Sequence, residues 1–193
     1  VQADIAKEED VIRLFETCEK DLGPVKGTVN SAGIVEPYGR MENLNYQEML
    51  PLIDINVNAA MIVSREAVRR MSPSLGGEGG SIVLLSSVSS RLGGAGYCIP
   101  YAASKGAVDA LGWGLAQEVA RDRIRVNVVS PGLIDTEIQP AGRAERTVRT
   151  CRRAVQANRK RWRKPFCGFC LKTPPTSPAV TWPYLTRGNT AHV

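Results

Sequence analysis

Short apolar runs alternate with longer segments of helical hydrophobic spacing along most of this chain. The helical segments predict helices over residues 7–21, 44–72 and 100–121, and the apolar runs predict strands over residues 26–30, 81–86 and 124–129. Residues 82–85, for example, are all apolar and follow a glycine-rich segment, which is typical of a buried parallel strand. Because strands that alternate with helices favour crossover connections, the pattern predicts an α/β fold with a doubly wound parallel sheet.

Polar and small residues follow the end of each predicted strand. Ser86 and Ser87 close the second strand, and Pro131-Gly132 follows the third. Asn30 ends the first strand and leads into Ser31-Ala32-Gly33, where small side chains let a ligand approach the backbone. Because parallel α/β sheets bind ligands at the carboxyl ends of their strands, these residues predict a site at that edge.

Tyr101 and Lys105 are the candidate reactive pair. They lie four residues apart, which is one helical turn, so both side chains point the same way. A nearby ammonium lowers the pKa of a phenol from about 10, and such a tyrosine can exchange a proton with an alcohol or carbonyl near neutral pH. The alternative is an interface tyrosine beside a solvated lysine. Asn56, within a helical pattern, is either a site residue or a buried amide that bonds backbone.

Taken together, these motifs resemble the short-chain dehydrogenase/reductase family, from about Asp4 to about Ile138. The resemblance implies a Rossmann-like fold that binds NAD or NADP and interconverts an alcohol with a ketone or aldehyde. The catalytic residues it implies are Asn56, Ser87, Tyr101 and Lys105. The cofactor-binding residues it implies are Asp4, Asn30, Ala32, Gly33, Tyr101, Lys105, Pro131, Gly132, Ile134 and Thr136.

The roles that the resemblance implies are chemical. Tyr101 is the general acid in reduction and the base in oxidation, Lys105 lowers its pKa and binds the nicotinamide ribose, Ser87 holds the substrate oxygen, and Asn56 positions a water. The spacing from Ser87 to Tyr101 is one residue longer than usual for the family, so Ser86 and Ser89 are rivals for the serine role. Asp4 either contacts the adenine, caps the helix that starts near Lys7, or does both.

The first residues lack the phosphate-binding glycine motif of that family. No G-x-x-x-G-x-G occurs in the 193 residues, and neither does the strand that would select NAD or NADP. We therefore expect a truncated or interior start, a sheet incomplete at its cofactor-binding half, and little or no turnover by the isolated chain. The rival interpretation is a non-catalytic relative that acts in binding or oligomerisation.

Composition changes after about residue 142. Residues 143–193 hold 12 of the 25 Lys and Arg residues but one of the 19 acidic residues, so we divide the chain into a partial Rossmann-like domain, 1–142, and a basic tail. The basic run at 159–164 could bind nucleic acid or an anionic membrane, and Cys167 and Cys170 could begin a zinc or redox site. We favour a third hypothesis. A shifted reading frame over residues 155–183 resembles the family's last helix and strand, which indicates a frameshift near residues 150–154 and predicts a largely disordered tail.

Several function classes are excluded by composition. No apolar run is long enough to span a membrane, no signal-peptide pattern opens the chain, and five cysteines do not suggest a disulfide framework. We therefore expect a cytoplasmic protein without a metal site. Its expected partners are a small alcohol or carbonyl substrate and, through the helices at 44–72 and 100–121, further copies in a homodimer or homotetramer. Nucleic acid is an unlikely partner.

Overall fold

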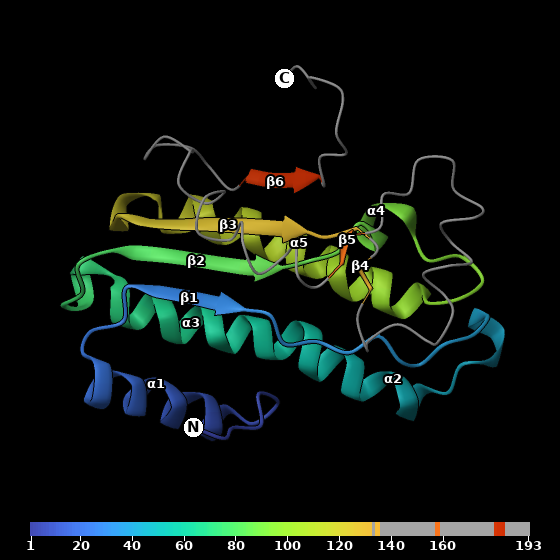
Figure 1. Cartoon of the computed structure of the whole chain (residues 1–193), viewed down its shortest axis with the longest axis horizontal. Coiled ribbons are helices and arrows are strands. Elements are labelled where there is room, and N and C mark those ends of the chain that lie inside the picture. Colours follow the sequence, from blue (N-terminus) through green and yellow to red (C-terminus); the bar gives the residue numbers. More distant parts are fainter. Residues whose placement is uncertain (133, 136–156, 159–179, 184–193) are drawn as a thin grey trace, which may run out of the picture.

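The computed structural model describes residues 1–132, 134–135, 157–158 and 180–183. Four parallel strands form one sheet in the order β1-β2-β3-β6, with the helices arranged along it (Figure 1). The strands of this sheet are β1 (Gly27–Asn30), β2 (Gly80–Leu85), β3 (Ile124–Ser130) and β6 (Val180–Pro183), and β4 (Ile134–Asp135) pairs separately with β5 (Ala157–Asn158). The α-helices are α1 (Glu8–Leu22), α2 (Tyr46–Ile53), α3 (Ala59–Met71), α4 (Ser89–Leu92) and α5 (Ile99–Glu118). The remaining turns are η1 (Met41–Asn43), η2 (Asp54–Asn58), η3 (Pro73–Leu75) and η4 (Ala120–Asp122). The predicted α/β class with a parallel sheet is confirmed.

The core lies between one face of the sheet and the helices α1, α3 and α5. Alternate residues of a strand share a face, so Ile82 and Leu84 of β2 point the same way, as do Ile124, Val126 and Val128 of β3. These residues form one buried cluster with apolar residues of the three helices. That cluster fixes the helices on the strands and so fixes the positions of their polar residues.

Gly112 allows α5 to lie close against the sheet. A Cβ at this position would stand 2.1 Å from Val128 Cγ2, well inside van der Waals contact. We expect Gly112→Ala to destabilise the fold by about 1–3 kcal/mol, because overpacking forces the helix or strand to shift. The measurement is the urea midpoint of unfolding.

Gly114 provides the matched control in the same helix. Nothing lies within 4 Å of a Cβ built on Gly114, which is exposed. Gly114→Ala is expected to stabilise the chain by up to about 1 kcal/mol through helix propensity. An equal response of the two variants would show that close packing at Gly112 is unimportant.

The helix predicted over 44–72 is not one continuous α-helix. It is divided into α2 and α3 by the π-helical turn η2, whose residue Asn56 is buried. The extra residue in a π-turn rotates the side chains that follow it about the helix axis. Such turns are frequent at functional sites. The apolar spacing is disturbed as a result: Leu52 is buried, but Ile53 and Met61 are 38% and 47% exposed.

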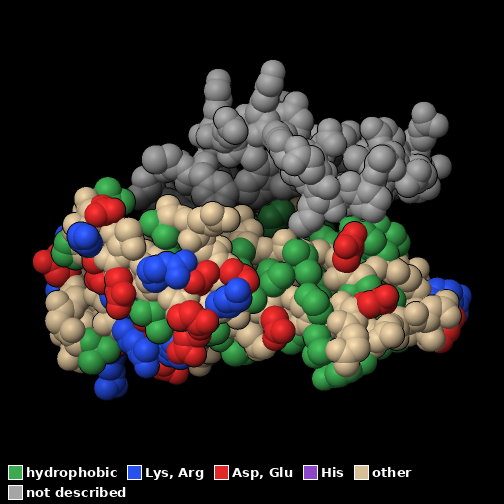
Figure 2. Space-filling model, turned by 90° about the horizontal axis from the view of Figure 1, so that it is seen from below, with side chains coloured by type: hydrophobic (Ala, Val, Ile, Leu, Met, Phe, Trp, Pro, Cys, Tyr) green, Lys and Arg blue, Asp and Glu red, His purple; other side chains and the backbone are tan. Residues whose placement is uncertain are grey.

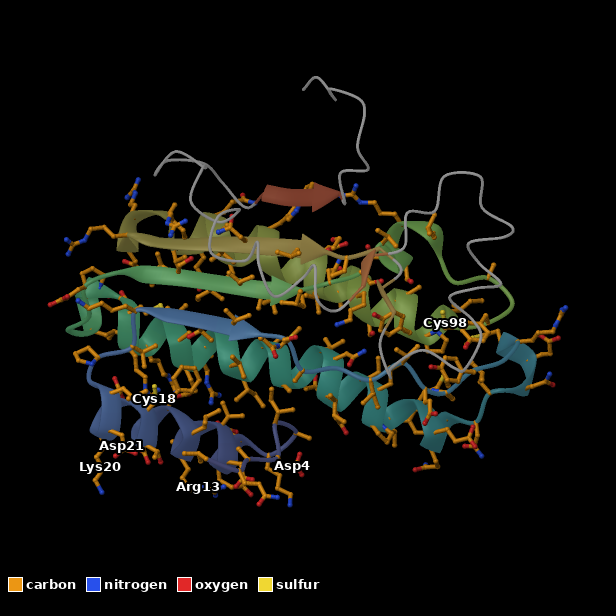
Figure 3. All side chains as sticks on the ribbon, in the orientation of Figure 1. Asp4, Arg13, Cys18, Lys20, Asp21 and Cys98 are labelled. Carbon is orange, nitrogen blue, oxygen red and sulfur yellow. The ribbon has the colours of Figure 1, made fainter. Side chains whose placement is uncertain are left out.

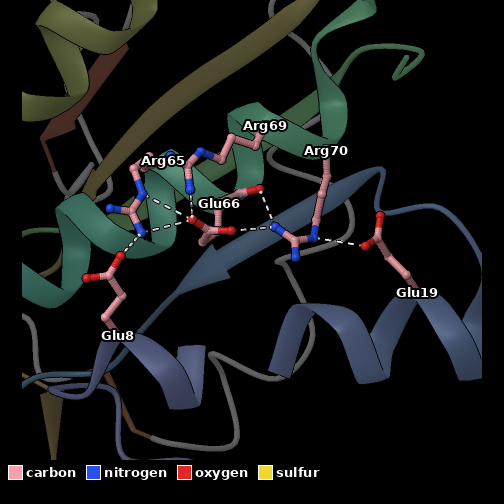
Figure 4. Close-up of polar contacts among 6 residues, drawn as sticks. All are labelled: Glu8, Glu19, Arg65, Glu66, Arg69 and Arg70. Carbon is pink, nitrogen blue, oxygen red and sulfur yellow. Dashed lines mark hydrogen bonds and ion pairs between the residues drawn. The ribbon is translucent and has the colours of Figure 1, made fainter. Parts of the chain in front are cut away.

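A cluster of charged side chains joins α1 to α3 (Figure 4). Glu66 of α3 is 3% exposed and accepts hydrogen bonds from Arg65, Arg69 and Arg70. Two of these arginines continue to α1, where Arg65 pairs with Glu8 at 2.6 Å and Arg70 with Glu19 at 2.9 Å. On the outer face of the molecule, acidic and basic side chains are interspersed (Figure 2).

The two cysteines in the described part of the chain, Cys18 and Cys98, are not joined in a disulfide and lie far apart (Figure 3). The basic run at 159–164, Cys167 and Cys170 lie outside the described residues, as does most of the tail. The tail prediction needs correction at two places, since Ala157–Asn158 forms β5 and Val180–Pro183 forms β6, which pairs in parallel with β3. The tail predicted to be largely disordered therefore contributes a strand to the sheet, and β6 pairs with residues Asn127–Ser130 of β3, whose backbone groups need partners there.

Candidate active site

The candidate site lies where β1, β2 and β3 end. The segments that follow β2 and β3 are held together by backbone bonds: Ser86 N donates to Val129 O at 2.8 Å and Val88 N donates to Pro131 O at 3.0 Å. Ser87 and Gly132 are thus on adjacent segments at the carboxyl edge of the sheet, as the sequence predicted.

Lys105 is held by the end of β2 through both its side chain and its backbone. The buried Nζ donates to Leu85 O at 2.8 Å, and Ser86 Oγ donates to Lys105 O at 3.0 Å. Because the Ser86 hydroxyl is engaged in this bond, Ser86 is a weaker candidate than Ser87 for the serine that holds the substrate oxygen. The ammonium carries three donors, one of which is directed at Leu85 O.

Ser87 is placed against Tyr101 by a tight turn. Its Oγ accepts from Ser89 N at 3.1 Å, and its side chain lies near enough to the Tyr101 phenol to lower the pKa of that group. Ser89 is the first residue of α4, whose backbone contributes to this turn rather than its side chain. The contact shows that the longer spacing between Ser87 and Tyr101 is accommodated before α5 begins.

The direction of the Tyr101 pKa corrects a sequence prediction. Burial raises the pKa of the phenol above its usual 10.0, the side chain of Ser87 lowers it, and the nearby Cys98 raises it again, with a net rise. The prediction that Lys105 lowers this pKa is wrong for this structure. The Lys105 Nζ is directed to Leu85 O and lies 5.8 Å from the centre of the Tyr101 ring. Tyr101 is therefore a protonated phenol at neutral pH, as a proton donor must be.

Burial also lowers the pKa of Lys105 from 10.5 to about 8, with the carboxylate of Asp109 opposing the shift. A folded pKa below the unfolded one means that the unfolded chain binds more protons between about pH 8 and 10.5. Stability therefore rises with pH across that window, and the destabilisation is fully present below it.

We expect Lys105→Met to stabilise the fold at neutral pH by up to about 3 kcal/mol, although loss of the bond to Leu85 O reduces this gain. The measurement is denaturant unfolding of both proteins from pH 7 to 10. The difference in stability should shrink as the pH rises, and a difference that is constant with pH would contradict this assignment.

Asn56 connects the loop after β1 to α5. Its Nδ2 donates to Ile34 O and to Ser104 Oγ, both at 2.9 Å, and its Oδ1 accepts from Ile34 N at 2.8 Å. A Cβ on Gly33 would lie 3.1 Å from Asn56 Oδ1 and 3.2 Å from Lys105 Nζ. Gly33 thus keeps a space open between the amide and the ammonium.

The other predicted cofactor-binding residues divide into two groups. Asn30 is buried and its Oδ1 accepts from Ala32 N at 3.3 Å, which shapes the turn before Gly33. Pro131 and Gly132 follow β3, Ile134 begins β4, and Thr136 lies outside the described residues.

Asp4 lies in the turn before α1, apart from the Tyr101 region. Its Oδ1 accepts from Ala6 N, and its Oδ2 lies 3.6 Å from Lys7 Nζ. The capping position of α1 is Lys7, without a side-chain bond, so the prediction that Asp4 caps this helix is wrong. The physical reason is that Asp4 closes its own turn two residues on, which ends before the helix begins.

Sequence reasoning missed three groups that the structure brings into the site: the Leu85 carbonyl, the Ile34 backbone and the Ser104 hydroxyl. Backbone groups leave no signal in a side-chain pattern. Ser104 did leave one, since it directly precedes Lys105 and follows Tyr101 by three residues. Within the described part of the chain, no three His, Cys, Asp or Glu residues are grouped so as to hold a metal ion. Nor does any described helix have the length and apolar character needed to cross a membrane.

Comparisons with known proteins agree with this geometry. A family model described as short chain dehydrogenase matches residues 1–147. The chain is 44% identical over 142 residues to an uncharacterized oxidoreductase, YgfF, of Escherichia coli, covering 74% of this chain and 58% of that protein. It is 39% identical over 135 residues to a human 3-oxoacyl-[acyl-carrier-protein] reductase, covering 70% and 55%.

A solved structure titled "ElxO with NADP Bound" is similar as well. It has a TM-score of 0.65 and 31% identity, and the match covers 71% of this chain and 54% of that one. The chain thus spans a little over half the length of each of these three proteins.

Proposed function

Because the chain belongs to the short-chain dehydrogenase/reductase family, we propose that it is the catalytic part of an NAD(P)-dependent oxidoreductase that interconverts an alcohol with a ketone or aldehyde. The observation that carries the proposal is the position of Ser87 near the Tyr101 phenol, whose pKa it lowers, with the buried Lys105 one helical turn further on. A hydroxyl, a phenol and an ammonium at the carboxyl edge of a parallel sheet suit proton transfer to a carbonyl oxygen.

In the reduction direction, Tyr101 donates its phenolic proton to the substrate oxygen. Burial raises its pKa, so the proton is present at neutral pH. Ser87, which lies near the phenol, donates to the same oxygen and holds it within reach. Lys105, whose Nζ is held by Leu85 O, is left to bind the cofactor ribose rather than to act on the phenol. A bound NADH or NADPH supplies the hydride.

The residues present fit the nicotinamide end of such a cofactor. Gly33 leaves open the space between Asn56 Oδ1 and Lys105 Nζ, and a side chain there would crowd both groups. Lys105 and Tyr101 would bind the ribose hydroxyls, and Asn30, Ala32, Pro131 and Gly132 would line the approach. Ile134 and Thr136 are further proposed contacts of the cofactor, and Asp4 is proposed to contact its adenine.

We also propose that residues 1–142 form the functional domain, since the family match ends at residue 147. Sequencing the encoding DNA across residues 150–154 tests the frameshift that would explain the basic tail.

Further copies of the chain are proposed partners through α3 and α5. Cys18 and Cys98 form no disulfide among the described residues, which fits a reducing, cytoplasmic location.

The test is carbonyl-dependent oxidation of NADH and NADPH, with 3-oxoacyl thioesters, ketosugars and simple ketones as substrates. Two proteins are compared: the 193-residue chain, and the same chain with any residues that its gene encodes before Val1. We expect near-background turnover from the first, which has no G-x-x-x-G-x-G to bind a diphosphate. Turnover by the second supports the proposal, and its absence with every substrate and both cofactors would overturn it.

A further inference from the structure

Ser104 is a buried hydroxyl between two proposed site residues. It lies on α5, 1% exposed, one residue before Lys105. Its Oγ donates to Tyr101 O at 2.8 Å and accepts from Asn56 Nδ2 at 2.9 Å. It therefore joins the helix that carries Tyr101 and Lys105 to the π-turn that carries Asn56.

We infer that Ser104 is a positioning residue that, together with the backbone of Ile34, fixes the orientation of the Asn56 amide. This inference rests on the proposed function. A hydroxyl has one proton, and Ser104 uses it on the Tyr101 carbonyl. Toward Asn56 it can therefore only accept, so the amide must present its NH₂ group. An amide turned the other way would set its oxygen against the Ser104 oxygen, leaving two acceptors in contact inside the protein.

The consequence of this orientation lies on the opposite side of the amide. With Nδ2 directed at Ser104, Oδ1 faces Ile34 N and the space kept open by Gly33, which Lys105 Nζ also borders. An acceptor beside an ammonium is favourable, whereas an NH₂ group there would repel it. Ser104 thus acts on the polar environment of Lys105 through Asn56, without itself touching a substrate or cofactor.

The experiment follows the side-chain amide of Asn56 by NMR in the ¹⁵N-labelled 193-residue chain, with the signal assigned by its loss in Asn56→Ala. In Ser104→Ala we expect this signal to shift and its hydrogen exchange with water to quicken about tenfold, as loss of one buried hydrogen bond implies. Ser104→Thr retains the hydroxyl and should restore the original signal. An Asn56 signal unchanged in Ser104→Ala would overturn the inference.

Ser86→Ala is the matched control. Ser86 is 4% exposed and also donates from Oγ to a carbonyl of α5, that of Lys105, but it has no bond to Asn56. We expect it to leave the Asn56 signal in place, and an equal shift in both variants would assign the effect to general loosening of α5. If Ser104→Ala does not fold, Ser104→Cys, a weak acceptor of similar size, should give the same shift in smaller degree.

These readouts do not depend on turnover. A change of the Asn56 signal in Ser104→Ala supports the inference even if the chain preceded by its gene-encoded residues reduces no carbonyl, and that lack of turnover counts against the proposed function alone. Turnover by that longer protein, with an Asn56 signal that is unchanged in Ser104→Ala, supports the proposed function and counts against the inference.

Discussion

Replacing Glu66 with alanine is expected to destabilise the fold by about 3–5 kcal/mol, because it removes the buried carboxylate that accepts from three arginines and leaves Arg70 with Glu19 alone. Glu66 accepts from Arg65, Arg69 and Arg70, and Arg70 is itself only 14% exposed. The Arg70 guanidinium lies 5.0 Å from the centre of the Phe15 ring in the core, so it cannot simply turn outward to water. The measurement is urea unfolding at neutral pH.

Glu8 gives the matched control, since it belongs to the same cluster but its side chain is 54% exposed. Glu8→Ala is expected to cost less than about 1 kcal/mol, as exposed pairs do. Glu66→Gln, which keeps the volume and removes the charge, should fall between the two. A loss below about 1 kcal/mol for Glu66→Ala would mean that this cluster contributes no more than a surface pair.

The same carboxylate gives the cluster a pH dependence. Burial raises the pKa of Glu66, but the hydrogen bonds from Arg70 and Arg65 and the attraction of Arg69 and Arg70 outweigh it, so the folded pKa is below the usual 4.5. A lowered carboxylate pKa stabilises the fold fully above pH 4.5 and loses that contribution as the pH falls through the folded value. The difference between wild type and Glu66→Gln should therefore narrow in acid.

Tyr101→Phe is expected to reduce carbonyl-dependent turnover by about 10²–10⁴-fold, the usual contribution of a positioned general acid. The substitution removes the phenolic proton and the contact of the phenol with Ser87, and leaves the ring and the backbone bond to Ser104 in place. The measurement is steady-state kinetics in the chain preceded by its gene-encoded residues, the form expected to turn over. Cofactor binding, followed by fluorescence titration, should weaken far less than turnover, because only the hydrogen bond of the phenol to the ribose is lost.

Tyr46 is a suitable control for the loss of a phenol, because it is 65% exposed at the start of α2. Tyr46→Phe should leave kcat and KM essentially unchanged. A Tyr101→Phe protein that retains more than about a tenth of its turnover would exclude Tyr101 as the general acid.

The sequence pattern was sufficient for β1, β2 and β3 and for the outer limits of the long helices, but not for β4, β5 and β6. The strand predicted over 124–129 is Ile124–Ser130, and the helix over 7–21 is Glu8–Leu22. It was also sufficient to bring Ser87, Tyr101 and Lys105 to one place, since strand ends in a parallel sheet share an edge and a four-residue spacing shares a helix face. Both rules follow from the regular spacing of residues in strands and helices, and the structure agrees with them at these three positions.

Features that depend on tertiary surroundings were not predictable. Nothing in the residues around Asn56 distinguishes a π-turn from an α-helical one, and the rotation that it causes depends on packing against α5 and the Ile34 loop. Glu66 has the pattern of a solvated charge, and only the docking of α1 buries it. The Tyr101 pKa was predicted from one neighbour, whereas burial has the largest effect.

The strand order of the described sheet also bears on how the chain acquires its structure during synthesis. β2 lies beside β1 and β3 lies beside β2, so each follows its neighbour in the chain with a helix in between. As the chain leaves the ribosome, β2 and β3 therefore each find one hydrogen-bonding neighbour already complete, and only the pairing of β3 with β6 waits for a distant later strand. Such sequential pairing keeps the loops that must close short and limits the time that unpaired strand edges are exposed to other chains.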